Sequence, residues 1–522
     1  MNFRYLIRQV GMLSLVVAIA MLVPLAYSAV QARQGVPLEA EALTALCVGT
    51  GAAILVGIVL ILAGRRGDIE SMGRREALLL VAISWIGGSA LAAVPFYTFG
   101  LIAPDTLPDA SEPYTAAAQF HSLANCYFEA VSGLTTTGAT ILSDIQGLPR
   151  GLLLWRSLTH WLGGVGIVVL FVAVLPMLGI GGKKLFQIEA AGPQQQGVRP
   201  RISETARVLW VIYCTLTLAN ILSLKLAGLD WFNAVCHTFG TVATGGFSPL
   251  NASVGHYRSP LVDWITVGFM VLGAINFGLY YRLVNRQFSA VWKDTELRVF
   301  LAILIGATII IMISLTGTTL FATNGDEQPV GFVDSATPAA FQATSLMTTT
   351  GFATFDFNRW PFLADAILLG LMLLGGCAGS TTGGLKIIRI VVAAKVVWNE
   401  VERVFRPNVV RTLRVNGSPI DEPLRLAVVG YILLLLALFS LGSVGIILLQ
   451  TGGEEIDFVG AATASLACLF NVGPGLHRVG PMENFDFFTP AAKLLLSLWM
   501  ILGRLEVFAV IVLFHPRFWT ND

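Results

Sequence analysis

One short pattern occurs four times along this chain. In each copy an apolar stretch runs into a turn that ends in glycine, and the copies read FEAVSGLTTTGATI (128–141), CHTFGTVATGGFSP (236–249), FQATSLMTTTGFAT (341–354) and TASLACLFNVGPGL (463–476). The first and third copies align without a gap. Four copies of one loop predict four-fold pseudosymmetry about an axis, with the loop backbone facing whatever lies on that axis.

Composition indicates the medium in which these loops fold. The chain has 522 residues, of which 55% are hydrophobic and only 12% charged, whereas a soluble protein carries about 25% charged residues. Apolar stretches of about 20 residues recur, and each is long enough to cross a bilayer as a helix. The six cysteines form no C-x-x-C pair and are expected to be small buried hydrophobes. We therefore predict a polytopic membrane protein.

The apolar stretches predict ten full spans, with boundaries uncertain by several residues. They are 11–31, 41–63, 77–100, 152–180, 206–228, 260–284, 298–321, 362–396, 424–450 and 490–514. Arg4 and Arg8 precede the first span, as in a signal peptide, but its apolar stretch is long for one. We expect it to remain uncleaved.

The four repeated segments lie between pairs of spans, at 118–137, 230–245, 335–350 and 457–472. Each is apolar but short, and each breaks at Thr or Gly. This is typical of a re-entrant element, in which a half-helix is followed by extended backbone that returns to the same side. Irregular backbone at membrane depth is tolerated only where it lines a water-filled cavity or is buried in protein.

The basic residues concentrate in alternate loops, which hold 24 of the 33 Lys and Arg residues. The positive-inside rule assigns those loops and both termini to the cytoplasm. The predicted fold is an all-α polytopic membrane protein with two leading helices and four helix–re-entrant loop–helix repeats around a pore. The expected division is 1–70 for the leading helices and 71–182, 183–290, 291–398 and 399–522 for the four repeats.

Extended Thr-Thr-Gly backbone presents successive carbonyl groups toward one axis. Four such stretches make rings of carbonyl oxygens that replace the hydration shell of a monovalent cation. Glycine is expected where the chain adopts angles closed to other residues, close to its neighbours. The competing interpretation, that each Thr-Gly marks an ordinary extracellular turn, does not explain four copies at the same topological place.

Seven motifs together resemble the TrkH/KtrB/HKT superfamily of cation transporters, and within it the TrkH-type potassium uptake family of bacteria. They are FEAVSGLTTTGAT, WRSLTHWLGGVGIVVL, HTFGTVATGGFS, ATSLMTTTGFAT, GGCAGSTTGGLKIIR, FNVGPGL and LGRLEVFAVIVLFHP. The resemblance covers essentially the whole chain. It implies a potassium-conducting pore in the bacterial inner membrane, a homodimer, and a cytoplasmic ring of nucleotide-binding, TrkA-like regulatory subunits.

The resemblance also implies which backbone binds K⁺. The expected filter residues are Thr136, Thr137, Gly138, Thr244, Gly245, Gly246, Thr349, Thr350, Gly351, Asn471, Val472 and Gly473. In plant relatives a serine at the first glycine position accompanies sodium preference, so Gly138 favours potassium here. The fourth loop departs most from the pattern, and selectivity is therefore expected to be weaker than in a symmetric potassium channel.

The span at 362–396 is interrupted by GGCAGSTTGG, and such residues break a helix in mid-membrane. In the family, the corresponding segment is an intramembrane loop that obstructs conduction. The expected gate residues are Gly375, Gly376, Gly379, Ser380, Thr381, Thr382, Gly383 and Gly384. A small-residue packing face between helices is the competing interpretation. A Walker loop is disfavoured because Leu385 stands where the motif requires Lys.

Arg504 lies inside the last predicted span, where a charge is costly unless it faces the pore or a partner. The resemblance implies a place beside the gate loop, as an electrostatic barrier to cations. A salt bridge to Glu129 or another carboxylate is the alternative. Lys386 and Arg389 are expected to extend to the cytoplasmic interface. Near the filter exits, Asp144, Asp356, Glu483 and Asp486 either attract cations or are ordinary solvated loop charges.

The loops at 183–207 and 386–425 are the longest and most basic of those assigned to the cytoplasm. They are candidate docking surfaces for the regulatory ring, or simply basic loops near anionic lipid. No catalytic triad, acid–base pair or metal-ligand spacing is present, so we expect no enzyme activity. His160 and His237 are expected to be packing residues. The competing function is a K⁺ symporter coupled to H⁺ or Na⁺, with Glu129 as the candidate proton carrier.

Overall fold

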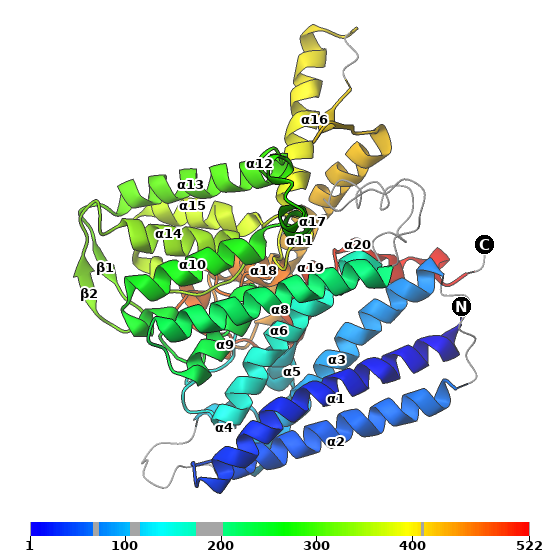
Figure 1. The fold of residues 1–522 in the computed structure, drawn as a ribbon, viewed down its shortest axis with the longest axis vertical. Helices are drawn as coiled ribbons and strands as arrows, with labels where there is room; N and C mark the ends of the chain where they lie inside the picture. The colour runs from blue at the N-terminus through cyan, green and yellow to red at the C-terminus, as the bar shows by residue number, and fades with distance from the viewer. Residues whose placement is uncertain (1, 66–72, 105–114, 174–201, 409–411, 521–522) are drawn as a thin grey trace.

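A computed structural model describes residues 2–65, 73–104, 115–173, 202–408 and 412–520. Long helices run side by side, and the two ends of the chain lie at the same end of this bundle, whereas the hairpin β1–β2 lies at the other end (Figure 1). The strands of the described residues form two short antiparallel hairpins, β1 (Thr319–Phe321) with β2 (Glu327–Pro329) and β3 (Arg414–Val415) with β4 (Ser418–Pro419). The predicted all-α architecture is confirmed in its essentials.

Two leading helices, α1 (Phe3–Arg33) and α2 (Glu39–Ala63), form a hairpin that lies along one side of the molecule (Figure 1). Glu39, at the start of α2, is fully buried. Its carboxylate accepts hydrogen bonds from the Ser28 hydroxyl (2.6 Å) and from the Gly151 amide (3.2 Å). A buried carboxylate needs such partners. The Ser28 bond joins the two helices of the hairpin, and the Gly151 bond connects the hairpin to α6.

The first half of the remaining chain contains two helix–short helix–helix units. The first comprises α3 (Arg74–Ile102), α4 (Thr115–Gln119), α5 (Leu123–Leu134) and α6 (Arg150–Ala173). The second comprises α8 (Ile202–Leu226), α9 (Trp231–Val242), η2 (Ser253–Tyr257), α10 (Pro260–Ala274), α11 (Phe277–Val284) and α12 (Phe288–Trp292).

Two further units follow in the second half. The third comprises α13 (Thr295–Leu315), the β1–β2 hairpin, α14 (Ala336–Met347), η3 (Phe357–Arg359), α15 (Phe362–Leu373) and α16 (Ile387–Phe405). The fourth comprises α17 (Glu422–Leu449), α18 (Phe458–Leu469), η4 (His477–Val479), α19 (Pro490–Arg504), α20 (Phe508–Ile511), η5 (Val512–Phe514) and η6 (Pro516–Phe518).

Six helices in the described residues are long and apolar enough to cross a membrane, and two bent pairs raise that number to eight. The bends are corrections to the predicted straight spans at 260–284 and 490–514. The angle is 94° between α10 and α11, and 111° between α19 and the helical segment that follows it. The predicted span at 298–321 also ends early, because α13 stops at Leu315 and residues 319–321 form β1.

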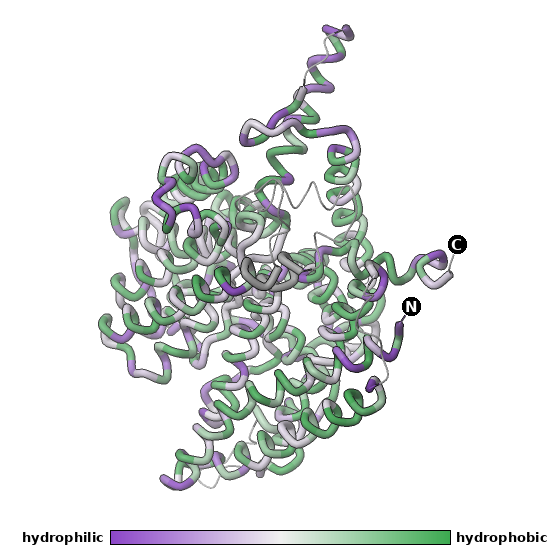
Figure 2. The backbone as a smooth tube through the Cα atoms, turned by 45° about the vertical axis from the view of Figure 1, so that its right-hand side comes forward, coloured by the Kyte–Doolittle hydropathy of each residue, from purple (hydrophilic) through white to green (hydrophobic). Residues whose placement is uncertain are grey.

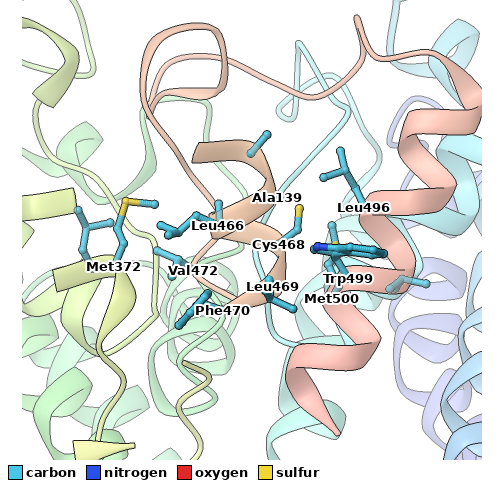
Figure 3. Packing of buried hydrophobic residues seen from close by; sticks show 14 of the residues in the cluster. Ala139, Met372, Leu466, Cys468, Leu469, Phe470, Val472, Leu496, Trp499 and Met500 are labelled. Carbon is cyan, nitrogen blue, oxygen red and sulfur yellow. The ribbon is translucent and has the colours of Figure 1, made fainter. Parts of the chain in front are cut away.

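Side chains of the short helix α18 (Phe458–Leu469) pack with those of its neighbours in the main hydrophobic cluster (Figure 3). Hydrophobic residues follow the long helices, whereas hydrophilic residues gather in the loops and on the projecting α16 region (Figure 2). Apolar side chains such as Ile19, Leu55 and Leu433 are exposed on the outer surface. A surface of this kind is stable when it is covered by lipid.

Candidate ion filter and gate

The four repeated segments form four short helices of equal length. Each of α5, α9, α14 and α18 has 12 residues. Each is too short to span a bilayer, since a span needs about 20 residues. The sequence expectation of short helices at these places is met, and each helix runs directly into the glycine-containing turn.

All four turns have the same backbone conformation. The second residue after each helix is left-handed, with φ of 51° at Thr136, 53° at Thr244, 53° at Thr349 and 54° at Asn471. The next residue then donates its amide to a carbonyl five residues back, as in Thr137 to Ser132 (2.9 Å) and Val472 to Ala467 (2.8 Å). This is the Schellman helix ending, which normally uses glycine at the left-handed position.

Threonine in a left-handed conformation is a genuine outlier, because its branched Cβ crowds the backbone. Three of the four loops contain such a threonine, at 136, 244 and 349. Backbone strain of this kind costs on the order of 1–3 kcal/mol per residue and persists where the surrounding structure holds it, often at functional sites. The strain therefore marks these turns as more than surface connections.

The four key glycines lie in a closed ring. A Cβ atom built on Gly473 would lie 2.6 Å from the carbonyl oxygen of Thr137. In the same way, Gly138 lies against the carbonyl of Gly245, Gly246 against that of Thr350, and Gly351 against that of Val472, each too close to admit a Cβ. Each loop thus touches the next one in sequence order, and the fourth touches the first.

The glycine ring opens into a cavity that all four glycines line. Glu483 is the one acid among its lining residues. The other acids considered from sequence have local partners: Asp144 accepts from Asn251 (2.9 Å), Asp356 pairs with Arg359 (3.3 Å), and Asp486 pairs with Lys493 (3.2 Å). Glu483 is therefore the one of these four acids that lines the cavity at the ring.

The fourth loop departs from the pattern for a visible reason. The side-chain amide of Asn471 donates to the Thr137 hydroxyl (2.9 Å) and to the Met500 carbonyl (2.9 Å). In loops 1 and 3 hydroxyls pair within the loop instead, Thr135 with Thr137 (2.7 Å) and Thr348 with Thr350 (2.8 Å). Asn471 thus connects the last loop to the first across the join of the ring.

The glycine-rich segment between α15 and α16 lies against the same loops. Residues 374–386 contain no helix, so the segment is not a helical packing face. The Gly383 amide donates to the Thr349 hydroxyl (2.8 Å), and the Thr381 hydroxyl donates to the Val242 carbonyl (3.0 Å). A Cβ on Gly383 would lie 2.5 Å from the Phe470 carbonyl. The segment therefore contacts the second, third and fourth loops or the short helices before them.

The same segment explains the bend between α10 and α11. Cys377 donates its amide to the Ala274 carbonyl (2.9 Å), and Phe277 donates its amide to the Gly379 carbonyl (3.0 Å). These bonds supply partners for backbone groups that a continuous helix would have paired internally. The straight span predicted at 260–284 was wrong because its hydrogen-bond partners come from a segment about a hundred residues away.

Arg504 is buried beside this segment. Its guanidinium donates to the Thr381 carbonyl (2.7 Å) and to the Gly163 carbonyl on α6 (3.1 Å). The alternative pairing with Glu129 does not occur, because Glu129 is bonded to Arg156 at 2.6 Å. Arg504 therefore places a cationic group against the glycine-rich segment.

Lys386 and Arg389 correct a further expectation, since both side chains are buried rather than extended to an interface. Lys386 turns back and donates to the carbonyl of Thr382, to its hydroxyl (3.1 Å) and to the Gly383 carbonyl (3.5 Å). Arg389 pairs with Glu506 at 2.5 Å. The available signal was that both residues follow the glycine-rich segment directly in the sequence. That position does not tell whether a side chain extends to the interface or turns back into the protein.

The comparisons with known proteins agree with this geometry. A family model described as "TrkH: Cation transport protein" matches residues 103–520. The Trk system potassium uptake protein TrkH of Escherichia coli K12 is 36% identical over 99% of this chain and 100% of its own length. The TrkG protein of that strain is 34% identical over 86% of each chain. A crystal structure of the potassium transporter TrkH from Vibrio parahaemolyticus, 32% identical, superposes with a TM-score of 0.83 over 100% of both chains.

Proposed function

The chain belongs to the TrkH family of cation transport proteins, and from that premise we propose that it takes up potassium across the bacterial inner membrane. The family consists of transporters, not enzymes. One observation supports the proposal above the others: four loops of identical backbone form a ring in which each glycine touches the carbonyl of the next loop. A ring of carbonyl oxygens is the chemistry that substitutes for the hydration shell of K⁺.

In this proposal the filter consists of the backbone of residues 136–138, 244–246, 349–351 and 471–473. Carbonyl dipoles bind the ion, and the cavity lined by the four glycines and Glu483 is its entrance. Gly138 keeps the first position free of a side chain, which favours K⁺ over Na⁺ by the family resemblance. Asn471 makes the ring uneven, so that discrimination is weaker than in a strictly four-fold pore.

The proposed gate is the segment that contains Gly375, Gly376, Gly379, Ser380, Thr381, Thr382, Gly383 and Gly384, together with Arg504. Its contacts with the second, third and fourth loops support a position in the ion path. The positive charge of Arg504 would repel a cation leaving the filter, because charges interact strongly where water is scarce. Opening then requires the segment and Arg504 to separate.

We further propose that the chain acts as a homodimer with a cytoplasmic, nucleotide-binding regulatory ring. The candidate contact is the far half of α16, which projects from the body of the protein (Figure 1). Trp398, Val404 and Phe405 are exposed there, beside the exposed Arg403 and Arg406. Exposed apolar groups edged by charge are typical of a protein interface. The other candidate, 183–207, lies mostly outside the described residues.

The proposed topology has both termini in the cytoplasm, and four repeats at 71–182, 183–290, 291–398 and 399–522 behind a leading region at 1–70. Two of these boundaries fall within helices, 290/291 in α12 and 398/399 in α16, whereas those near 70 and 182 fall outside the described residues. The repeats are thus units of symmetry about the pore and not separately folded domains.

The alternative of K⁺ symport with H⁺ or Na⁺ rests on a carboxylate that can exchange protons in the ion path. Glu129 was the candidate, but it accepts hydrogen bonds from Arg156 (2.6 Å), Thr140 (2.9 Å) and the Ile141 amide (3.0 Å). These donors already occupy both oxygens of the carboxylate. The geometry therefore favours a pore that conducts K⁺ alone.

The test is ion flux into proteoliposomes that contain this chain, with K⁺ or Na⁺ gradients, for wild type and Gly138→Ser. We expect K⁺ preference in wild type and its loss in the variant. If the Gly138→Ser variant keeps the preference for K⁺ over Na⁺, the filter assignment is refuted. If the closed wild type carries no ion, Arg504→Ala opens it for the same measurement. K⁺ influx that drives H⁺ or Na⁺ against its gradient would establish symport instead.

A further inference from the structure

A second motif repeats four times and concerns the helix that follows each filter loop. It reads HWLGG (160–164), MVLGA (270–274), MLLGG (372–376) and MILGR (500–504). Arg504 therefore occupies a position that is Gly164, Ala274 or Gly376 in the other repeats. The first position of the motif is buried in all four copies and is methionine in three of them. In the first repeat it is His160.

The imidazole of His160 lies directly behind the second filter loop. A Cβ built on Gly245 would lie 2.6 Å from Cδ2, 2.7 Å from Cγ and 2.8 Å from Nε2 of His160. Real Cβ atoms essentially never come within 3.0 Å of another heavy atom. The ring thus occupies the space in which a side chain at position 245 would stand.

Position 245, like position 160, carries a residue type that differs from its counterparts in the other three repeats. Its counterparts in the other loops carry branched side chains, namely Thr137, Thr350 and Val472. Backbone conformation does not explain the glycine, because Gly245 is not among the residues with positive φ. His160 is the one histidine at the first motif position, and Gly245 is the one glycine at the equivalent filter position. These two exceptions contact each other.

The usual arrangement is visible in another repeat. Met372, the counterpart of His160, and Val472, the counterpart of Gly245, are both buried in one hydrophobic cluster (Figure 3). The corresponding pair there is a flexible thioether side chain, which fills irregular gaps well, and a branched side chain. At the second loop a flat, rigid ring meets bare backbone instead.

The imidazole is held firmly on its other sides. Its Nδ1–H donates to the Gly133 carbonyl on α5 (2.7 Å), and its face stacks on Phe247 with ring centroids 4.1 Å apart. The Arg156 guanidinium lies over the Phe247 ring at 3.5 Å and pairs with Glu129. The ring of His160 is therefore fixed against α5 while it contacts Gly245.

We propose that His160 is a specificity-determining positioning residue, which sets the position of the Gly245 carbonyl in the filter by acting as a rigid wedge behind it. The Gly245 carbonyl lies against Gly138 in the first loop, so a displacement at 245 changes the opening between the first and second loops. This inference rests on the proposed filter function. It adds that ion discrimination depends on a side chain that does not touch the ion.

The test compares apparent K⁺ and Na⁺ affinities of detergent-solubilised protein, from the rise of the thermal unfolding midpoint with each ion. This readout does not require an open gate. We expect His160→Met to reduce the K⁺/Na⁺ affinity ratio roughly tenfold, a difference of about 1.4 kcal/mol. Gly245→Thr alone should abolish ion stabilisation. The double variant, which copies the methionine–threonine pair expected in other repeats, should recover part of the ratio.

The control is Met270→Leu, a conservative change at the counterpart position in the second repeat, which should leave the ratio unchanged. His160→Asn, which keeps a donor near Gly133 but removes the ring, replaces His160→Met if that variant does not fold. An unchanged ratio in the His160 variants, a tolerated Gly245→Thr, or purely additive effects in the double variant would overturn the proposal. Gly138→Ser, measured in parallel, separates this outcome from failure of the filter assignment.

Discussion

Gly473 lies against the carbonyl oxygen of Thr137, although the two residues are separated by most of the chain. The contact joins the last filter loop to the first. The Asn471 amide reinforces it by donating to the Thr137 hydroxyl (2.9 Å). Four loops that lie along one chain thereby become a closed ring, and the properties of the ring depend on each of its joins.

A methyl group at a ring join should be destructive. In Gly246→Ala the new Cβ would overlap the Thr350 carbonyl, and φ of 82° would add backbone strain. We expect loss of K⁺ flux and a loss of stability of about 1–3 kcal/mol from overpacking. Flux assays and thermal unfolding measure the two effects.

The matched control for that variant is Gly268→Ala on α10, where nothing lies within 4 Å of the new Cβ. Alanine in a helix interior is favoured over glycine by about 0.5–1 kcal/mol. Normal flux with equal or higher stability is therefore expected. Similar damage from both substitutions would contradict the ring geometry.

Removal of Arg504 should open the pore. Arg504→Ala removes the hydrogen bond to the Thr381 carbonyl (2.7 Å) and the positive charge beside the proposed gate. We expect K⁺ flux in proteoliposomes without the regulatory subunit to rise about tenfold, as for a typical coupling of 1–3 kcal/mol. Arg504→Lys keeps the charge and should remain closer to wild type. A variant that folds but stays closed would show that Arg504 is not part of the gate.

Lys386 should stabilise the same segment at the residues next to Thr381. Lys386→Met removes the ammonium that bonds the Thr382 and Gly383 carbonyls but keeps an unbranched apolar side chain. We expect higher flux in the absence of the regulatory subunit, with a smaller effect than that of Arg504→Ala. Lys395→Met is the control, because Lys395 is half-buried on the same helix and its ammonium donates to the Arg414 carbonyl (2.6 Å), away from the segment. Equal effects of the two lysine variants would rule out a specific role for Lys386.

The buried pair of Glu129 and Arg156 should matter for stability. Both side chains are almost fully inaccessible, and the N–O distance is 2.6 Å. Glu129→Ala leaves an uncompensated buried cation, so we expect a loss of about 3–5 kcal/mol in the free energy of unfolding. Thermal or denaturant unfolding in detergent measures it.

A double variant, Glu129→Leu with Arg156→Met, removes both charges and should be less destabilised than Glu129→Ala. If the single variant is the milder of the two, the pair does not act as a compensated buried ion pair. Either result leaves the filter assignment to be judged by ion flux.

Sequence reasoning succeeded where the signal is local. The four short helices, the turns that end in Gly138, Gly246, Gly351 and Gly473, and the interruption after α15 were predicted from apolar length and from residue types that break helices. Family membership followed from the same motifs. Reasoning failed at the bends after Ala274 and Arg504 and at Arg389, whose partner Glu506 lies elsewhere in the fold. It also failed at Lys386, which turns back onto the nearby Thr382 and Gly383.

The sequence by itself determined that this protein has four copies of one turn, because helix length and turn conformation depend on hydrogen bonds between residues a few positions apart. Only the tertiary structure decided which loop touches which, that Arg156 rather than Arg504 pairs with Glu129, and that His160 meets Gly245. Those pairings depend on contacts between segments far apart in the chain. Internal symmetry restricts such contacts, but packing selects among them.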